Sequence, residues 1–399
     1  MIDDLVNIIK NIKLEGFTDK KIVRDESSRF EKIYDYIEFT TENQVILKKL
    51  EIHEIGFDEL RRRYNNIYAI DSSTRAIDTP YMFIGVGSAT CINRFTGDSL
   101  EYPSITSIMA QGEKSYDYIV IIPEIEGFEK DLLDKLEEKK VITRNPAGIR
   151  YSPRYSKYVV LDELRLLLEN KVLNMLLEKE RYRDLYVFVD GPIYYTPPLV
   201  YQVNEMHGIR DDLVKYYIES WKVLVGIRIN IIDKLMREKN ITVLGIVKRL
   251  NRSNILSRRD PVGLSSGNMS DEAYLSVLTT LWFKDKKITP YYIGPIIYDP
   301  GKLPVKLPKK TIYYIGIPRR RITNETDYRN YMFYRIEYVE GAEENLEPVI
   351  YDSIHTGSIL PLSILLADNR VKKITNALVN YFIRMTGLPG ESTYQYITF

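Results

Sequence analysis

Two short apolar runs that each end in an aspartate place the strongest constraint on the fold. Residues 67–71 read Ile-Tyr-Ala-Ile-Asp, and residues 185–190 read Leu-Tyr-Val-Phe-Val-Asp. Continuous apolar runs of this length are typical of strands buried on both faces of a sheet, as in parallel α/β sheets. In an open sheet of this kind, ligands bind at the carboxyl ends of the strands. The two runs therefore predict a buried sheet with Asp71 and Asp190 at its ligand-binding edge.

The segments around these runs give the predicted order of elements. Residues 81–92 and 116–125 are rich in Ile, Val, Phe and Tyr, which favours two further strands and, with the first run, an antiparallel meander. Residues 159–178 and 209–239 have the pattern of helices, and residues 241–248 that of a strand. The order β-β-β-α-β-α-β predicts an α/β fold with a mixed sheet, in which parallel β-α-β units follow the three-stranded meander.

Further elements are expected towards the carboxyl end. Ser270 is a suitable cap for a helix that starts at the next residue. Strands are expected near residues 311–316 and 331–338, and a last helix over residues 361–384. The prolines within residues 300–318 indicate a loop or an edge region rather than a domain linker.

We expect three parts along the chain. Residues 1–64 mix an amphipathic start with a second charged helical stretch over residues 42–63, which predicts an N-terminal helical arm. Residues 65–385 hold the predicted sheet and form the main domain. Residues 386–399 are predicted as a C-terminal tail.

Composition excludes several classes of function. With 56 Lys+Arg and 55 Asp+Glu the net charge is +1, so a nucleic-acid partner needs a local basic groove. A single cysteine, Cys91, cannot form an internal disulfide and indicates a reducing compartment. The three histidines lack zinc-ligand spacing, and no phosphate-binding, dinucleotide-binding or serine-esterase motif is present.

The same composition bears on location and habitat. No apolar stretch reaches the length that spans a membrane, and the acidic start differs from a signal peptide, so we expect a cytoplasmic protein. Thirty-two tyrosines with abundant Ile, Lys, Arg and Glu resemble the usage of hyperthermophile proteins.

Asp71 and Asp190 become neighbours if their two strands pair. Carboxylates that close repel each other and raise each other's proton affinity, an effect that a bound divalent cation offsets. Oxygen ligands suit Mg²⁺ or Mn²⁺. An aspartate before Ser-Ser or Gly-Pro is also a good turn former, so a purely structural role stays open for each residue.

A nucleic-acid partner would meet several basic and aromatic residues near these acids. Arg75 follows the first aspartate, and Lys248 ends a predicted strand. A basic cluster comes directly after Lys248: Arg249, Arg252, Arg258 and Arg259. Tyr194 and Tyr195 follow the second aspartate, where they are candidates for stacking on bases. Solvated surface positions for the arginines and chance placement of the tyrosines are the competing interpretations.

The order of strands and acids resembles the ribonuclease H fold, and the local sequences resemble the archaeal NurA nucleases over most of the chain. Ile-Asp-Ser-Ser at residues 70–73 is similar to the family's first Asp-Gly-Ser, and Val-Asp-Gly-Pro-Ile at residues 189–193 to its second Asp-Gly-Ser-Leu. Leu-Gly-Ile-Val-Lys at residues 244–248 is similar to a Gly-Val-Val-Lys strand. The sequence departs from the family pattern at Ser72 and Pro192, where the family has Gly and Ser.

Weaker similarities follow in the family's order. They comprise Ser-Asp-Glu-Ala at 270–273, Tyr-Arg-Ile-Glu at 334–337, Glu-Pro at 347–348 and Leu-Leu-Ala-Asp at 365–368.

The resemblance implies a metal-dependent nuclease with four acidic ligands. They are Asp71, Glu169, Asp190 and Asp368, with Lys248 as a further catalytic residue. Two Mn²⁺ or Mg²⁺ ions held there would clamp the attacking and leaving oxygens. The helix acid has two candidates, and we favour Glu169 over Glu163 on the same helix because Glu169 lies about twenty residues before Asp190 and flanks the apolar stripe of the helix.

The resemblance also implies a substrate and partners. It describes a DNA nuclease that cuts single strands, resects duplex ends 5′→3′ during recombination repair, and works as a homodimer with a HerA-type hexameric translocase. One alternative is a catalytically silent relative that serves the translocase as a DNA-binding or regulatory subunit. Another keeps the fold but acts on RNA–DNA hybrids or branched junctions.

Overall fold

The computed structural model describes most of the chain between residues 45 and 386. The described ranges are 45–46, 51–56, 64–78, 82–105, 115–123, 130–197, 200, 212–260, 262–264, 269–283, 289–301, 303–318, 331–354 and 360–386. Within these ranges, no helix is both long and apolar enough to cross a membrane.

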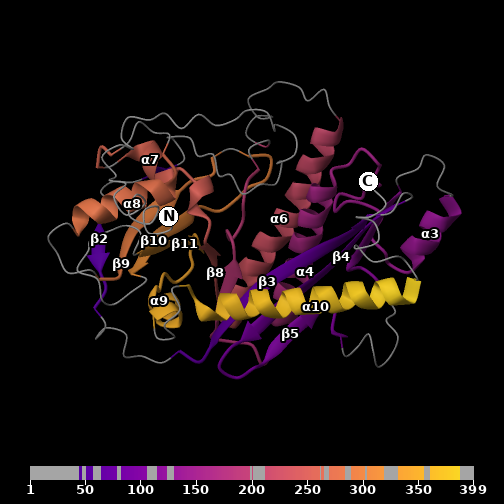
Figure 1. Cartoon of the computed structure of the whole chain (residues 1–399), viewed down its shortest axis with the longest axis horizontal. Helices are drawn as coiled ribbons and strands as arrows, with labels where there is room; N and C mark the ends of the chain where they lie inside the picture. The colour runs from indigo at the N-terminus through magenta and orange to yellow at the C-terminus, as the bar shows by residue number, and fades with distance from the viewer. Residues whose placement is uncertain are drawn as a thin grey trace, which may run out of the picture.

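The described strands join one mixed sheet (Figure 1). The strands are β1 (Val45–Ile46), β2 (Ile52–Glu54), β3 (Ile67–Asp78), β4 (Met82–Asn93), β5 (Ser99–Tyr102), β6 (Ile119–Pro123), β7 (Tyr186–Asp190), β8 (Thr242–Val247), β9 (Tyr291–Tyr298), β10 (Lys310–Pro318) and β11 (Tyr331–Val339). The helices are α3 (Lys130–Glu138), α4 (Lys157–Glu178), α6 (Asp212–Lys239), the short 3-10 helix η4 (Leu250–Arg252), α7 (Ile255–Arg259), α8 (Asp271–Trp282), α9 (Glu347–Ile354) and α10 (Leu362–Thr386).

The centre of the sheet has the predicted ribonuclease H-like order. The strands lie in the order β5-β4-β3-β7-β8. Strands β3, β4 and β5 pair antiparallel, whereas β7 pairs parallel with both β3 and β8. Helix α4 precedes β7, and α6 connects β7 to β8. The expected mixed α/β fold is therefore confirmed.

The third position of the meander differs from the prediction. We expected one strand over residues 116–125, but two short strands occupy this edge. Strand β5 pairs with one half of β4, from Ala89 to Ile92, and β6 pairs with the other half, from Met82 to Val86. Because β4 is twelve residues long, it offers room for both.

The sheet also continues further than the sequence predicts. Beyond β8 lie β11, β10 and β9, all antiparallel to their neighbours. Residues 310–318, expected in part as a loop or edge, form a strand between β9 and β11. Strand β9 was not predicted, and it contains Pro295, a residue type that seldom occurs inside a paired strand. The register shifts between Ile312 and Tyr314, and this irregularity accommodates Gly294 and Pro295.

The prediction for the N-terminal arm is wrong where the structure describes it. Residues 45–46 and 52–54, expected within a charged helical stretch, form β1 and β2 and pair with β9. Among residues 1–64, only 45–46, 51–56 and 64 belong to the described part of the chain, and residues 387–399 of the expected tail lie outside it. The proposed boundaries between the three parts stay predictions.

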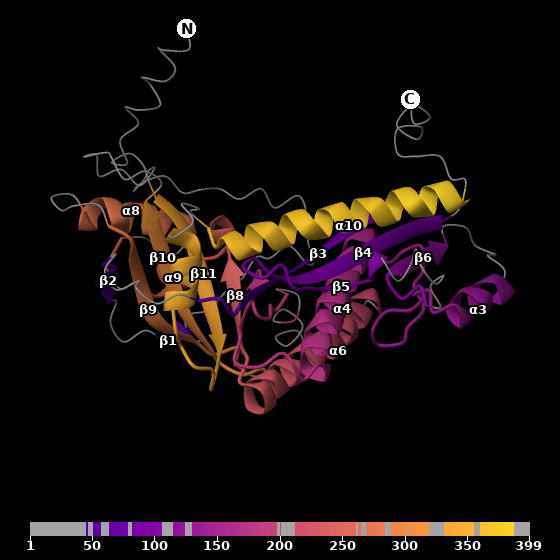
Figure 2. The same ribbon diagram turned by 90° about the horizontal axis from the view of Figure 1, so that it is seen from below.

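Helices cover both faces of the sheet (Figure 2). Helices α4 and α6 pack on one face, and α10 lies along β3 and β4 on the other. Thr375 anchors α10, because its hydroxyl lies 2.8 Å from the Ser88 hydroxyl and donates to the Ser73 carbonyl at 3.3 Å. Two turns earlier on this helix is Asp368, which α10 therefore holds against β3.

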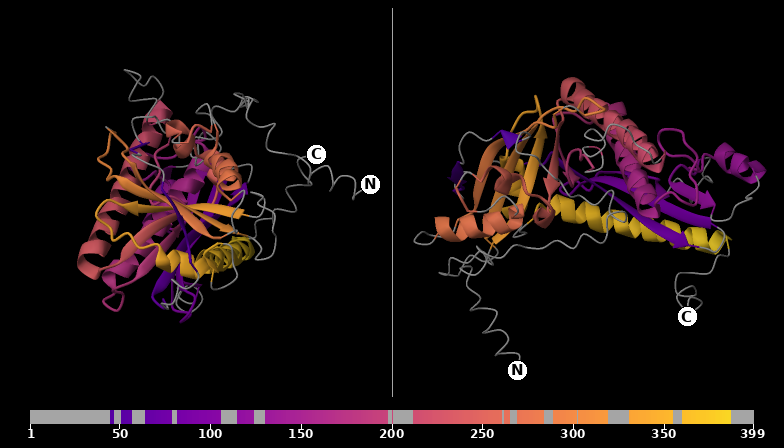
Figure 3. Two further views of the ribbon diagram at one scale, coloured as in Figure 1. Left: turned by 90° about the vertical axis from the view of Figure 1, so that its left-hand side faces the viewer. Right: turned by 90° about the horizontal axis from the view of Figure 1, so that it is seen from above.

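The sheet is strongly twisted, as expected for right-handed strand twist. In the right-hand view of Figure 3, strands β9–β11 (orange) stand at a steep angle to β3 and β4 (indigo). The parallel strands β7 and β8 lie between these two parts. Residues from both parts of the sheet therefore lie near the carboxyl ends of β7 and β8.

Candidate metal-binding site

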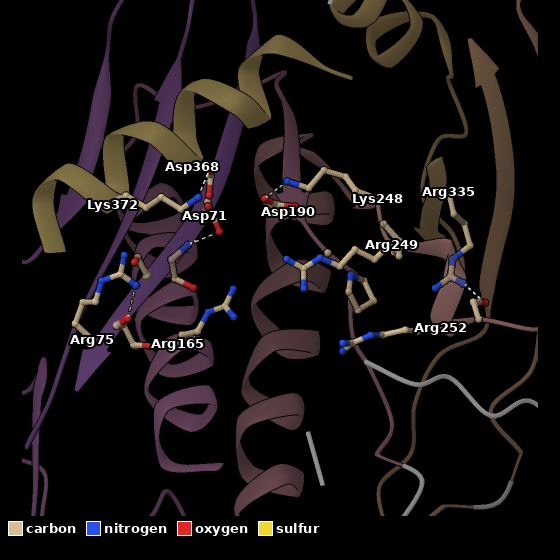
Figure 4. Close-up of a pocket in the computed structure, with 17 residues that line it drawn as sticks. Asp71, Arg75, Arg165, Asp190, Lys248, Arg249, Arg252, Arg335, Asp368 and Lys372 are labelled. Atoms are coloured by element: carbon tan, nitrogen blue, oxygen red, sulfur yellow. Dashed lines mark hydrogen bonds and ion pairs between the residues drawn. The ribbon is translucent and has the colours of Figure 1, made fainter. Parts of the chain in front are cut away.

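Three aspartates from three elements meet near the carboxyl end of β7 (Figure 4). Ile70 of β3 pairs with Val189 of β7 in parallel, so Asp71 and Asp190 take neighbouring positions. Asp368 reaches them from the first turns of α10. One carboxylate oxygen from each aspartate lies within 4.8 Å of the other two. The structure thus brings together three of the four predicted metal ligands.

Backbone geometry fixes the turn that follows Asp190. Gly191 has a φ of +122°, which favours glycine, and its N–H donates to the Ile246 carbonyl at 2.9 Å. A Cβ atom at Gly245 would lie 2.5 Å from the backbone nitrogen of Ile193. Glycine at 245 therefore allows the chain after Asp190 to pass directly against β8.

Asp71 does not end its strand, contrary to the prediction. Strand β3 continues to Asp78 because β4 pairs with it along this whole length. Only the pairing with β7 stops at Ile70. The Asp71 side chain therefore lies where the parallel neighbour ends, and the following Ser72 donates its N–H to Asp71 Oδ1 at 2.8 Å.

The three acids form an electrostatically strained group. Burial, together with the negative charge of Asp190, raises the pKa of Asp71 to about 8. Burial also raises the pKa of Asp190, although Lys248 opposes this shift with its Nζ 2.6 Å from Asp190 Oδ2. Lys372 pairs in the same way with Asp368, at 2.7 Å. Three hard carboxylate oxygens, two of them from acids with a raised pKa (Asp71 and Asp190), fit a divalent cation such as Mg²⁺ or Mn²⁺.

The two candidate glutamates of α4 have different surroundings. Glu169 is buried beside Asp71, where its charge contributes to the raised pKa of Asp71. One Glu169 oxygen accepts a hydrogen bond from the Ser72 hydroxyl at 2.5 Å, and the other pairs with Arg228. Glu163 instead accepts from the hydroxyls of Tyr151 and Tyr155 and lines a different cavity. The structure therefore leaves Glu169 as the glutamate that lies near the aspartates.

The aspartates open into a cavity of about 380 Å³ with a strongly basic lining. The predicted residues Arg75, Lys248, Arg249 and Arg252 all line it, whereas Arg258 and Arg259 are not among the lining residues. The lining also includes three basic residues that the sequence analysis missed: Arg165, Arg335 and Lys372.

Sequence spacing alone could have indicated two of these missed residues. Arg165 precedes Glu169 by four residues, and Lys372 follows Asp368 by four, so each shares a helix face with a predicted acid. Figure 4 shows Arg165 reaching from α4 into the space beneath Asp71, opposite Arg249.

The prediction that Tyr194 stacks on bases is wrong. Tyr194 is 1% exposed, its hydroxyl donates to the Pro308 carbonyl, and the ammonium of Lys310 lies 4.1 Å from its ring centre. Tyr195 is buried as well. After Gly191 the chain turns into the core beside β8 rather than toward the cavity mouth, so neither ring is available to a nucleotide.

Comparisons with known proteins give one family match and several similar solved structures. No curated protein matches the chain. Solved structures with similarity include the NurA nuclease from Sulfolobus solfataricus, with 14% identity over 86% of this chain and 89% of that chain and a TM-score of 0.43. A structure described as NurA bound to dAMP and manganese has 12% identity over 77% of this chain and 84% of that chain, with a TM-score of 0.38. Human ENDOV has 10% identity over 85% of this chain and 94% of that chain, with a TM-score of 0.30. The model of the NurA domain matches residues 65–372, most of the sequence, and the chain belongs to the NurA family.

Proposed function

We propose that this NurA family member is a divalent-metal-dependent DNA nuclease. The observation that carries the proposal is the convergence of Asp71, Asp190 and Asp368 within 4.8 Å beside a basic cavity. The acids suit a cation, and the basic lining suits the phosphate backbone of a nucleic acid. This combination favours an enzyme over a silent DNA-binding subunit, which needs the basic groove but not the acids.

Each group of residues has a role in this proposal. Asp71, Asp190 and Asp368 hold Mn²⁺ or Mg²⁺, and Glu169 completes the ligand set. Bound metal, as a pair of ions, supplies a water of lowered pKa and neutralises charge on the phosphate. Lys248, beside Asp190, contacts the scissile phosphate and offsets the charge of the Asp190 carboxylate while no metal is bound.

The remaining basic residues bind DNA on both sides of the acids. Arg75 comes from β3, whereas Arg249 and Arg252 come from the segment after β8. Their guanidinium groups suit phosphate oxygens without regard to base sequence.

The biological part of the proposal rests on the family. We propose a single-strand endonuclease and 5′→3′ exonuclease that resects DNA ends, as a homodimer together with a HerA-type hexameric translocase. Matched substrates of DNA, RNA–DNA hybrid and branched junctions separate this role from the alternatives.

Cleavage of end-labelled single- and double-stranded DNA with Mn²⁺, Mg²⁺ or EDTA tests the activity. We expect metal-dependent cleavage that falls by about 1000-fold or more in Asp71→Ala, because a lost metal site removes several kcal/mol of transition-state stabilisation. Asp184→Asn is the control, since Asp184 lies just before the opposite end of β7 and hydrogen-bonds Asn240. Cleavage that persists in Asp71→Ala, or that continues in EDTA, contradicts the proposal.

A further inference from the structure

A cluster of buried charges lies in β10 and β11, behind the candidate metal site. Lys310, Arg335 and Glu337 are each at most 2% exposed. Glu337 Oε2 lies 2.9 Å from Lys310 Nζ, and Glu337 Oε1 lies 2.6 Å from an Arg335 Nη atom. Burial alone would raise the pKa of Glu337, but the two cations hold it below its usual value, so Glu337 is a carboxylate.

A cluster of this kind is costly for stability alone. Removing charges from water carries a large penalty, and apolar residues of similar volume often give equal or greater stability. The contacts that the cluster makes with the rest of the chain therefore deserve a functional explanation.

These contacts converge on the turn that follows Asp190. The backbone N–H of Ile193 donates to Glu337 Oε2 at 3.2 Å. The ammonium of Lys310 donates to the Tyr194 carbonyl at 2.5 Å. Two successive residues of the turn, Ile193 and Tyr194, thus bind the same ion pair through their backbone, in addition to the hydrogen bond between Gly191 and Ile246.

Arg335 extends the cluster to the opposite wall of the cavity. Its Nη1 donates to the Ser253 hydroxyl at 2.8 Å, and Ser253 directly follows η4, which carries Arg252. Arg335 itself lines the cavity (Figure 4). The cluster therefore spans the space between the Asp190 turn and the basic segment after β8.

We propose that Glu337 and Lys310 are positioning residues, which hold the turn at residues 191–194 and thereby fix the Asp190 carboxylate for a divalent cation. The inference rests on the proposed metal site. Groups that orient a metal ligand affect metal affinity without touching the ion, and their loss typically costs 10- to 100-fold in affinity.

The test is a Mn²⁺ titration by calorimetry on the full chain, with a double substitution that keeps net charge unchanged. We expect Lys310→Met/Glu337→Gln to bind Mn²⁺ at least 10-fold more weakly than wild type, at temperatures where circular dichroism shows both folded. Lys171→Met/Asp117→Asn is the matched control, because this pair, 2.5 Å apart, does not line the cavity. We expect the control to stay within twofold of wild type. Affinity within twofold in Lys310→Met/Glu337→Gln overturns the proposal.

Glu337→Asp provides a second variant in case the double substitution does not fold. It keeps the buried negative charge but is one methylene too short to bind Ile193, Lys310 and Arg335 together. We again expect Mn²⁺ affinity to fall by about 10-fold. We also expect kcat to fall by a larger factor than the factor by which KM for DNA changes. Unchanged Mn²⁺ affinity in this variant also overturns the proposal.

The titration separates this inference from the proposed nuclease activity. A wild-type protein that binds Mn²⁺ but cuts no DNA overturns the nuclease, while the positioning role is still decided by the affinities of the variants. A wild-type protein that binds no Mn²⁺ overturns both.

Discussion

Asp71 and Asp190 lie side by side because Ile70 and Val189, the residues before them, pair in neighbouring parallel strands. The sheet thereby forces two carboxylates into a buried setting, and Asp368 adds a third from α10. Burial, and after it the negative charge of Asp190, raise the pKa of Asp71. Such an arrangement destabilises the folded protein when no metal is bound. A cation that binds the three carboxylates stabilises the folded state.

The first prediction concerns thermal stability with and without metal. In EDTA at pH 9, above the pKa of Asp71, we expect Asp71→Asn to unfold at a higher temperature than wild type, because it removes a charge that burial and the neighbouring Asp190 both disfavour. The gain in the free energy of unfolding should be on the order of 1 kcal/mol. Differential scanning calorimetry measures it.

Metal should reverse this ranking. Mg²⁺ at about 100 times its dissociation constant stabilises wild type by about 2.7 kcal/mol, and Asp71→Asn by much less. Asp184→Asn should respond to Mg²⁺ as wild type does. Equal stabilisation of wild type and Asp71→Asn would remove Asp71 from the site.

The second prediction separates the two roles assigned to Lys248. Lys248→Met keeps most of the aliphatic chain but removes the ammonium from Asp190. We expect single-stranded DNA to bind more weakly, with the slope of log K against log salt falling in magnitude by about 0.7, the value for one lost phosphate contact. Filter binding across a salt series in EDTA measures the slope.

Mn²⁺ binding should show the opposite trend in the same variant. Loss of a competing cation at Asp190 should leave Mn²⁺ affinity equal or higher. Lys234→Met, on the exposed face of α6, serves as the control for general loss of charge. An unchanged salt slope in Lys248→Met would show that Lys248 does not contact the backbone.

Local patterns were sufficient to predict the order of the central elements and the positions of Asp71 and Asp190. The apolar runs that end at Asp71 and Asp190, with helices between them, determine the β-β-β-α-β-α-β order, and parallel pairing brings the acids together. Asp368 had no such local signal. Its position depends on how α10 packs on β3 and β4, where Thr375 contacts Ser73 and Ser88, and only the family resemblance indicated it.

Long-range pairing explains most of what the sequence analysis missed. Strand β9 contains a proline that a regular strand would exclude, and it is accommodated by an irregularity opposite Tyr313. Tyr194 has an aromatic ring that suits stacking on a base. Gly245 allows the chain after Asp190 to pass close to β8, however, and the Tyr194 ring lies in the core. Neither outcome is visible without knowing which strands are neighbours.

The third prediction is a pH dependence of stability that originates outside the metal site. Burial raises the pKa of Glu163 to about 7, against hydrogen bonds from Tyr155 and Tyr151 that lower it. The folded state therefore binds a proton that the unfolded chain releases near pH 4.5, so the free energy of unfolding falls as pH rises from about 4.5 to 7.

Glu163→Gln should remove this part of the pH dependence. The full effect is at most about 3 kcal/mol, since each unit of pKa shift corresponds to 1.36 kcal/mol. Urea unfolding of wild type and Glu163→Gln at pH 5 and pH 7.5, both in EDTA, gives the comparison. The same decline with pH in both proteins would exclude Glu163 as its origin.

The last prediction decides which glutamate of α4 serves the metal site. Glu169 is tied to Ser72, the residue after Asp71, and to Arg228, whereas Glu163 binds two tyrosines beside another cavity. Glu169→Gln should lower metal-dependent cleavage by about 10- to 100-fold and weaken Mn²⁺ binding. Glu163→Gln, the same substitution on the same helix, should leave both cleavage and Mn²⁺ binding within about twofold of wild type.

Because Glu169→Gln also removes the partner of the buried Arg228, some loss of stability is expected, and cleavage must be measured well below the unfolding temperature. Strong loss of cleavage in Glu163→Gln with little in Glu169→Gln would contradict this assignment.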